Sequence, residues 1–507
     1  MLNRIGLVPG LLLVVMGSPL WSQTSEPDDF AASCSATVNR IISGVTVTGA
    51  ETFTLEGSSY CVVDGTRAPF LDIELVIPKA WSGQLLQRGG GGFDGTIRSA
   101  LSRSETGEVI GLLPLVADRG VAYVASNGGN RAKVEGEAAP QVWAGESPRA
   151  RDSAIDYAYR ATGTTIFFAK EAIAAVQGRY PEHSYFNGCS NGGRNAYIAA
   201  QRWPAEYDGI VAGCETMDMA GQTLGWLNIG RFDGTPGQLS PEQYSFAYRE
   251  AVAACDEDDG LRDGIIANPR ACEFRPAELA CDTKPTDLCL SPEQVATLDT
   301  LLSDVELDGQ VVYKGYNWAD LSSYGPRYNQ LASGFALIAT GDAGWLTPEY
   351  PRAFDPEHDS APLSLAMLRS GTDQDLIGVA QYVAGGGKLL SWHGNSDGLL
   401  SPNAHAAKHA EMLDLARELG METPREGAMF FTVAGSNHNG AGDMRGVDWF
   451  TAISDWAEKG RQPAGLTYTF EDASGPRSIP ICEYPAFPRY SGTGDPAKAE
   501  NFACTAP

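Results

Sequence analysis

The sequence has few basic residues relative to its acidic residues. Lysine and arginine number 37, against 63 aspartates and glutamates, and the formal net charge is −26. Nucleic acid and anionic membrane surfaces attract basic proteins, so this charge argues against both as partners. It suits a protein that stays in solution, and it says nothing about chemistry.

The sequence also lacks an apolar run long enough to span a bilayer, which takes about 20 residues. Its early apolar run covers residues 7–16, after the basic Arg4 and before the polar stretch 18–25. This pattern is typical of a signal peptide. We therefore expect residues 1–23 to be a signal peptide, cleaved around residues 22–24, and the protein to be secreted or periplasmic. Nothing in the sequence indicates an obligate protein partner.

The rest of the chain is organised around residues 185–195, Tyr-Phe-Asn-Gly-Cys-Ser-Asn-Gly-Gly-Arg-Asn. Within them, Gly188-Cys-Ser190-Asn-Gly192 fits the pattern G-x-S-x-G. Strand-forming residues precede it and helix formers follow, as in the nucleophile elbow of a serine hydrolase. The two glycines permit the sharp turn that presents Ser190. The alternative is a glycine-rich turn with a helix-capping serine.

Strands and helices alternate on both sides of this motif, which predicts an α/β fold with a parallel sheet. The alternation is interrupted between about 222 and 372, where cysteine, proline, glycine and aromatic residues mix without strand periodicity. We expect an α/β-hydrolase core formed by residues 24–221 and 373–507, with residues 222–372 inserted as a lid domain.

The stretch 85–95 predicts a strand that runs into a loop with four consecutive glycines. In an α/β-hydrolase, this loop supplies one backbone N–H of the oxyanion hole. We expect Gly91 or Gly92 to be that donor and the backbone N–H of Asn191 to be the second. The alternative is a flexible surface loop; a phosphate-binding loop is excluded because no Gly-Lys-Ser/Thr follows.

Only six histidines are present, so the general base can be sought by elimination. His438 lies in a glycine-rich loop after an apolar strand, where the base of this fold belongs. The orienting acid is expected after the preceding strand, at Asp397; the alternative is a turn aspartate before a glycine. His393 is expected to be structural. The pair at 405 and 409 lies on one helix face and is expected to face solvent or to form salt bridges.

A separate acidic segment lies at residues 255–265, where several aspartates occur in a loop that contains glycines. Calcium prefers oxygen ligands in such loops, although the glutamate of an EF-hand is missing. We expect structural calcium held by three carboxylates and two backbone carbonyls, from Asp256, Asp259, Asp263, Leu261 and Ile265. The alternative is a solvated acidic turn.

Ten cysteines fit an oxidising compartment. Their spacing suggests four local disulfides: Cys34–Cys61, Cys255–Cys272, Cys281–Cys289 and Cys482–Cys504. These pairs leave Cys189 and Cys214.

Together these stretches resemble the tannase/feruloyl esterase family, which includes fungal tannases, feruloyl esterases and bacterial mono(hydroxyethyl) terephthalate hydrolase. The resemblance implies an α/β-hydrolase core, a lid that holds calcium and the aromatic substrate, and the triad Ser190, Asp397 and His438. It also implies a small aromatic ester as substrate, of the feruloyl, galloyl or terephthalate monoester type. In the lid, Arg327, Phe335 and Trp345 are candidate substrate contacts, or equally lid core.

The chain departs from this family at one position. The family usually has a cysteine directly after the catalytic histidine, bridged to the cysteine before the serine, but here Asn439 replaces it. Cys189 and Cys214 would end neighbouring parallel strands, about 4.8 Å apart, which is within reach of a disulfide. We therefore predict a Cys189–Cys214 bridge.

Three other functions remain open on the same fold. A general short-chain carboxylesterase or a peptidase would keep the triad and differ in substrate. A non-catalytic binding protein would tolerate loss of triad members, and none is lost here.

Overall fold

A computed structural model describes residues 29–134, 137–138, 141–144, 147–215, 217–323, 327–438, 440–441, 446–472 and 475–507. The expected signal peptide, residues 1–23, lies outside the described residues. Within the part described, no helix has the length and apolar character needed to cross a membrane.

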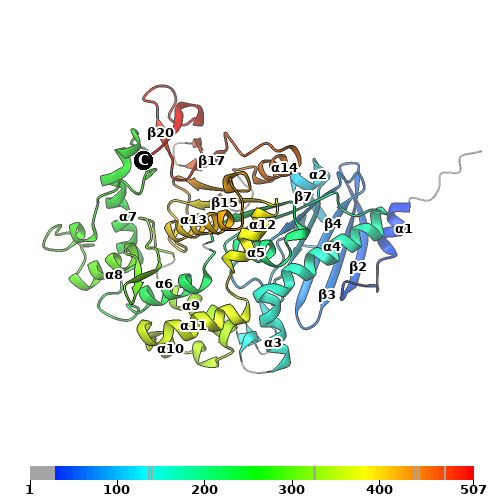
Figure 1. Ribbon diagram of the computed structural model, residues 1–507, viewed down its shortest axis with the longest axis horizontal. Coiled ribbons are helices and arrows are strands. Elements are labelled where there is room, and N and C mark those ends of the chain that lie inside the picture. Colours follow the sequence, from blue (N-terminus) through cyan, green and yellow to red (C-terminus); the bar gives the residue numbers. More distant parts are fainter. Residues whose placement is uncertain are drawn as a thin grey trace, which may run out of the picture.

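The described residues form one large sheet of eleven strands, which runs through the centre of the molecule (Figure 1). In spatial order its strands are β1 (Ile41–Ile42), β2 (Val45–Leu55), β3 (Ser58–Arg67), β4 (Leu71–Pro78), β8 (Ala122–Ser126), β5 (Gln84–Arg88), β11 (His183–Cys189), β12 (Gly209–Gly213), β15 (Lys388–Gly394), β16 (Ala428–Val433) and β19 (Cys482–Glu483).

The sheet changes character along its width. Strands β1 to β4 pair antiparallel, and β4 pairs antiparallel with β8. From β8 through β5, β11, β12 and β15 to β16 the pairs are parallel. In this parallel part the strands are almost entirely buried, as expected for a sheet covered on both faces. Their carboxyl ends meet at one edge, where the loops after β5, β11, β15 and β16 emerge.

Helices cover both faces of the parallel part. On one face lie α4 (Ala161–Gln177), α5 (Asn191–Arg202), α12 (Leu376–Ala384) and α13 (Pro402–Glu418), whose apolar residues share one core with the sheet. On the other face lie α2 (Pro114–Ala117) and α14 (Trp449–Lys459). The predicted strand–helix alternation is therefore present, and the fold is the α/β type that was expected.

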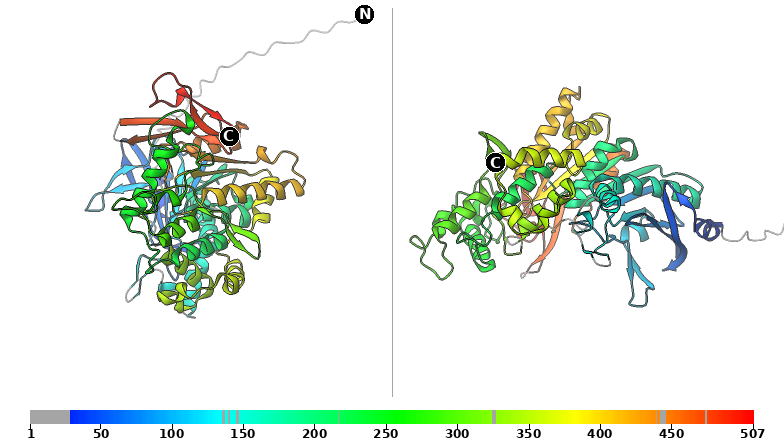
Figure 2. Two further views of the ribbon diagram at one scale, coloured as in Figure 1. Left: turned by 90° about the vertical axis from the view of Figure 1, so that its left-hand side faces the viewer. Right: turned by 90° about the horizontal axis from the view of Figure 1, so that it is seen from below.

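A mostly helical insert connects β12 to β15. Its elements are α6 (Met219–Gly230), α7 (Pro241–Cys255), α8 (Pro292–Leu302), β13 (Val305–Leu307), β14 (Gln310–Tyr313), α9 (Tyr328–Thr340), α10 (Glu349–Arg352) and α11 (Pro356–Ser370). They have their own aromatic and aliphatic core. Figures 1 and 2 show the insert at the end of the molecule away from β2 and β3. The expected lid boundaries fall inside α6 and just after α11.

Smaller elements complete the chain. Before the elbow are α1 (Asp29–Ser35), the hairpin of β6 (Leu101–Arg103) and β7 (Val109–Leu112), the pair β9 (Lys133–Val134) and β10 (Glu137–Ala138), and α3 (Pro148–Ile155). A π-helical turn, η2 (Asp156–Arg160), joins α3 to α4. The tail forms two hairpins, β17 (Thr467–Asp472) with β18 (Gly475–Pro480) and β20 (Phe487–Tyr490) with β21 (Phe502–Thr505).

All ten cysteines are paired, in the five pairs predicted. The bonds are Cys34–Cys61, Cys189–Cys214, Cys255–Cys272, Cys281–Cys289 and Cys482–Cys504, with Cα–Cα distances between 4.8 and 5.9 Å.

Candidate active site

Ser190 lies in a sharp turn between β11 and α5. Its φ of 61° and ψ of −130° are strained values for a residue with a side chain. A Cβ on Gly188 would lie 2.1 Å from the carbonyl oxygen of Gly192, so the turn requires glycine there. The geometry is that of the predicted elbow, and it leaves Ser190 partly exposed at the carboxyl end of the sheet.

The Cys189–Cys214 disulfide supports this turn from the side. Cys189 ends β11, and its neighbour across the ladder is Gly213 at the end of β12. The backbone N–H of Ser190 donates to Gly213 O at 3.1 Å and lies 3.0 Å from Cys214 Sγ. Cys189 Sγ also lies 3.6 Å from the carbonyl oxygen of His438. The disulfide therefore contacts the histidine loop, although Asn439 itself is outside the described residues.

Asp397 and His438 come from the loops after β15 and β16 and meet at the same edge. His438 Nδ1 lies 2.8 Å from Asp397 Oδ2, and both side chains are buried. Asp397 Oδ1 accepts hydrogen bonds from the backbone N–H groups of Leu399 and Leu400, at 2.8 and 3.1 Å. These bonds hold the carboxylate in place beside the imidazole.

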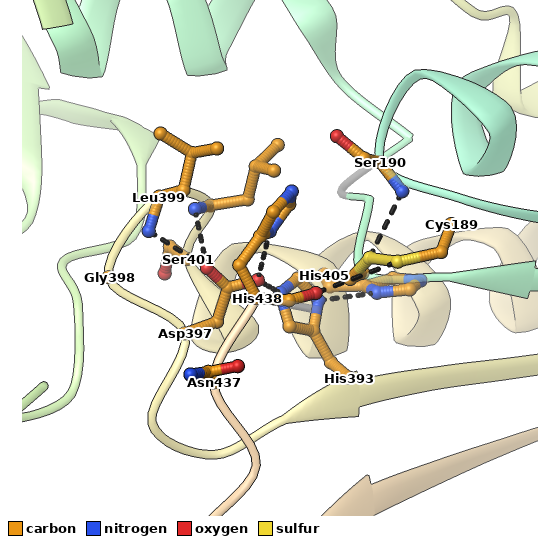
Figure 3. Close-up of polar contacts among 12 residues, drawn as sticks. Cys189, Ser190, His393, Asp397, Gly398, Leu399, Ser401, His405, Asn437 and His438 are labelled. Atoms are coloured by element: carbon orange, nitrogen blue, oxygen red, sulfur yellow. Dashed lines mark hydrogen bonds and ion pairs between the residues drawn. A yellow bond between two sulfur atoms is a disulfide. The ribbon is translucent and has the colours of Figure 1, made fainter. Parts of the chain in front are cut away.

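The charge state of Asp397 follows from its neighbours. Burial alone would raise the pKa of Asp397, but the charge of His438 and the hydrogen bonds from His393 and His438 outweigh it and hold that pKa below its usual value. Asp397 is therefore ionised throughout the neutral range. Figure 3 shows the His438 ring between Asp397 and Ser190. The three predicted residues thus lie together, in the order that nucleophilic catalysis needs.

One histidine expectation needs revision. His405 and His409 were expected to face solvent or to form salt bridges, and the structure buries both: their exposed fractions are 0% and 5%. Their helix face packs against β16, with ring centroids 4.6 and 5.5 Å from that of Phe430. His393, expected to be structural, directly contacts the carboxylate, with Nε2 2.9 Å from Asp397 Oδ2. No sequence spacing signals these contacts, because they join separate elements.

The glycine loop after β5 packs against the elbow. A Cβ on Gly89 would lie 2.6 Å from the Cα of Gly192, so only glycine permits this approach. Gly92 has a φ of 57°, and its carbonyl accepts a hydrogen bond of 2.6 Å from the Tyr157 hydroxyl. The loop that carries the expected donors Gly91 and Gly92 therefore lies beside the first turn of α5, where the N–H of Asn191 is.

A buried polar network that the sequence did not reveal joins this loop to α5. Asn191 Nδ2 donates to Asp94 Oδ1 at 2.7 Å, and its Oδ1 accepts from Arg194 Nε at 2.8 Å. Burial raises the pKa of Asp94 to about 6, although the hydrogen bond from Asn191 and the charge of Arg194 oppose the shift. Arg194 is fully buried and also donates to the carbonyl oxygens of Tyr157 and Ala158.

Aromatic side chains surround the glycine loop where it meets the insert. Phe93 contacts the rings of Trp143, Tyr157 and Phe335, with centroids 5.6 to 6.4 Å apart. Of the three lid candidates, Phe335 thus lies beside the loop. Trp345 instead packs within the insert, with its centroid 5.0 Å from that of Tyr350. Arg327 is exposed at the start of α9.

The acidic loop follows α7 and is closed by hydrogen bonds within itself. Asp256 accepts from the backbone N–H groups of residues 263, 264 and 265. Asp263 pairs with Arg477 of β18. Burial, together with the charges of Asp263 and Asp256, raises the pKa of Asp259 to about 7.

This arrangement bears on the expected calcium site. In the described part of the chain, no three side chains of the ligand types His, Cys, Asp and Glu are grouped closely enough to hold a metal ion. The three expected carboxylate ligands instead accept hydrogen bonds from within the loop, and Asp263 also pairs with Arg477. The backbone N–H of Leu261 donates to Asp259, and that of Ile265 donates to Asp256 and Asp263. The side chains do not form a metal cluster, and calcium stays a prediction.

Comparisons with known proteins show the family and the fold. The family model described as "Tannase and feruloyl esterase" matches residues 56–354 and 346–505. Mono(2-hydroxyethyl) terephthalate hydrolase from Piscinibacter sakaiensis is 29% identical, over 88% of this chain and 85% of its own length. Feruloyl esterase B from Aspergillus niger is 27% identical, over 85% of this chain and 83% of its own. The crystal structure of feruloyl esterase B from Aspergillus oryzae shares the fold, with a TM-score of 0.76 at 20% identity, over 94% of this chain and all of that one.

Proposed function

The chain belongs to the tannase and feruloyl esterase family and is a carboxylic ester hydrolase, and from that premise we propose that it cleaves aromatic-acid esters through an acyl-enzyme at Ser190. The observation that carries the mechanism is the buried His438–Asp397 pair beside the strained Ser190 turn. A serine hydroxyl is a poor nucleophile until a base accepts its proton, and this pair supplies an oriented base.

In the proposed reaction, His438 takes the proton of the Ser190 hydroxyl as its oxygen attacks the ester carbonyl. The N–H groups of Asn191 and of Gly91 or Gly92 stabilise the oxyanion. His438 then gives its proton to the leaving alkoxide as the C–O bond breaks, which leaves the acyl group on Ser190. A water molecule, deprotonated by His438, attacks the acyl-enzyme and releases the acid. Asp397 stays ionised and stabilises the imidazolium that forms twice in the cycle.

The proposed acyl group is aromatic, of the feruloyl, galloyl or terephthaloyl type. Two observations support this class: the substrates that the relatives' names print, and the ring cluster of Phe93, Trp143, Tyr157 and Phe335 beside the glycine loop. Rigid rings favour planar aromatic ligands through stacking and edge contacts. A general short-chain carboxylesterase is the alternative, and a peptidase would need to cleave the matching amide.

A substrate panel tests this function. Methyl ferulate, methyl gallate, mono(hydroxyethyl) terephthalate and a short aliphatic p-nitrophenyl ester are assayed with the wild type and Ser190→Ala. We expect a preference for one aromatic acid and loss of turnover in Ser190→Ala, while Ser102→Ala, at an exposed position of β6, keeps it. Activity on the aliphatic ester alone would overturn the substrate class. Turnover that survives in Ser190→Ala would overturn the mechanism.

Calcium at the acidic loop is a separate proposal, supported by three aspartates within one short loop, of which Asp256 and Asp259 are buried. Its role would be to stabilise the insert, since no acyl-transfer step needs it. The test is the thermal midpoint with calcium, with magnesium and with a chelator, for the wild type and Asp259→Asn. A calcium-specific rise that Asp259→Asn abolishes would support the proposal, and an unchanged midpoint would contradict it.

Export to an oxidising compartment is also proposed, and the five disulfides support it, because disulfides persist there. The N-terminal sequence of the exported protein tests it. A first residue near 23–25 would fit, and a retained Met1 would not.

A further inference from the structure

A line of buried polar groups extends from Asp397 Oδ2, the carboxylate oxygen that His438 also contacts. His393, on β15, places Nε2 2.9 Å from Asp397 Oδ2 and Nδ1 2.9 Å from the Nδ1 of His405 on α13. Asp397 Oδ2 thus has two imidazole neighbours, His438 and His393, and Figure 3 shows His393 next to His405. The side chains of Asp397, His393 and His405 are fully buried.

The line continues from His405 to two hydroxyl groups. His405 Nε2 lies 2.5 Å from the hydroxyl of Tyr197 on α5, and this hydroxyl lies 2.8 Å from that of Ser391 on β15. Three elements, β15, α13 and α5, each contribute to it. Such a hydrogen-bonded chain of side chains is costly to bury unless every donor and acceptor has a partner, and here every ring nitrogen and hydroxyl has one.

The donor and acceptor roles along the chain are linked. An ionised carboxylate only accepts, so the proton on His393 faces Asp397. The contact between the two Nδ1 atoms holds a single proton. If His405 donates it, His393 is neutral, His405 Nε2 accepts from Tyr197, and Ser391 donates to Tyr197. If His393 donates it, His393 is an imidazolium and every bond beyond it is reversed.

Two observations select the first arrangement. The 2.5 Å contact between Tyr197 and His405 suits a hydroxyl donor, because O–H bonds are shorter than N–H bonds, whose usual length is about 2.9 Å. The second arrangement would also place two cations against one carboxylate whenever His438 takes up the serine proton. The other titratable groups that face the chain are His409, beside His405, and Glu215, near Tyr197. Burial lowers the pKa of His405 well below its usual value, so His405 is neutral.

We propose that His393 is a second, neutral imidazole donor to Asp397, held in its Nε2–H form by the donor chain from Ser391 through Tyr197 and His405. The inference rests on the proposed function, because it concerns the carboxylate of that triad. His393 is a positioning residue: it never reaches the substrate. Its bond, with those of the Leu399 and Leu400 amides, prevents Asp397 from rotating away from His438 and leaves its full negative charge for the imidazolium that catalysis creates.

The kinetic test uses three variants of buried histidines. His393→Met removes the donor and keeps an apolar volume, whereas His393→Gln keeps an N–H group that can reach Asp397. His409→Met is the matched control, because His409 lies on the same helix as His405 but outside the chain. A lost hydrogen bond to a charged group corresponds to about a 10- to 100-fold change, so we expect His393→Met to lose that much kcat with KM unchanged.

We expect His393→Gln to recover most of this loss and His409→Met to keep the wild-type kcat. Equal losses in His393→Met and His409→Met, at equal folded fractions by circular dichroism, would show a general packing effect and overturn the proposal. So would a His393→Gln variant as impaired as His393→Met.

A second measurement needs no variant to be active. Nitrogen NMR of the wild-type protein, labelled with ¹⁵N in histidine, distinguishes protonated from unprotonated ring nitrogens. We expect His393 to carry its proton on Nε2 alone, and His405 on Nδ1 alone, and Tyr197→Phe to change the His405 signals. A doubly protonated His393 would overturn the proposal. This readout does not depend on turnover, so it tests the proton positions even if the proposed Ser190 mechanism fails. The substrate panel tests that mechanism separately.

Discussion

Removing the Cys189–Cys214 disulfide should lower both stability and kcat. The two cysteines are 25 residues apart, and closing a loop of that length removes enough chain entropy from the unfolded state to stabilise the fold by about 3.5 kcal/mol. The double change Cys189→Ala and Cys214→Ala should therefore lower the free energy of unfolding by about that amount. The effect on kcat has another cause: the bond's sulfur atoms contact the N–H of Ser190 and the carbonyl of His438.

The Cys281–Cys289 disulfide provides the matched control. It closes a loop of 8 residues within the insert, which corresponds to about 2.5 kcal/mol. Urea unfolding followed by fluorescence measures both losses, and hydrolysis of the preferred ester measures kcat. We expect both double variants to lose stability and only the first to lose kcat. A Cys189→Ala, Cys214→Ala enzyme with wild-type kcat would refute the view that this bond braces the catalytic turn.

Three further outcomes follow from the elbow and its neighbours. Gly188→Ala should abolish activity, because its Cβ would lie 2.1 Å from Gly192 O, and its kcat under native conditions tests this. Arg194→Met should lower the free energy of unfolding, measured in urea, by about 1–3 kcal/mol for each buried acceptor that loses its donor. Burial raises the pKa of Asp94 to about 6, so the protonated carboxyl stabilises the fold. This contribution to stability is complete below about pH 4 and is lost as the pH rises through about 6. The urea midpoint should fall over this pH range, and Asp94→Asn should flatten the fall.

Much of the fold could be predicted because its signals are local. The apolar strand expected before His438 is β16, and the helix expected to carry residues 405 and 409 is α13 (Pro402–Glu418), since periodicity and turn residues act within a few neighbours. The cysteine pairs followed from spacing and from the pairing of adjacent parallel strands. The π-helical turn at Asp156–Arg160 could not be predicted, because it arises where α3 and α4 join and no residue type specifies it.

The candidate site was predictable only as far as chain order determines it. A fixed fold places the nucleophile, acid and base after successive strands, which is enough to select Ser190, Asp397 and His438. The residues behind them depend on packing between distant elements. His405 has the same sequence environment as a solvent-facing histidine, and only the contact of α13 with β16 buries it. Asp94 and Arg194 were missed for the same reason, because their partners lie on other elements.

The two halves of the site are held by different means, and both depend on the insert. His393 on β15 and the amides of Leu399 and Leu400 hold the Asp397 carboxylate. The loop that carries these amides accepts hydrogen bonds from the insert, from Tyr328 to the carbonyl of Gly398 and from Trp226 and Tyr316 to that of Leu399. On the side of the expected oxyanion donors, Arg194 donates to Asn191, to the carbonyls of Tyr157 and Ala158, and at 3.3 Å to the carbonyl of Thr372, where the insert returns to the core. A shift of the insert therefore acts on the carboxylate loop as well as on the N–H donors, and substitutions that move the insert should change kcat as well as substrate preference.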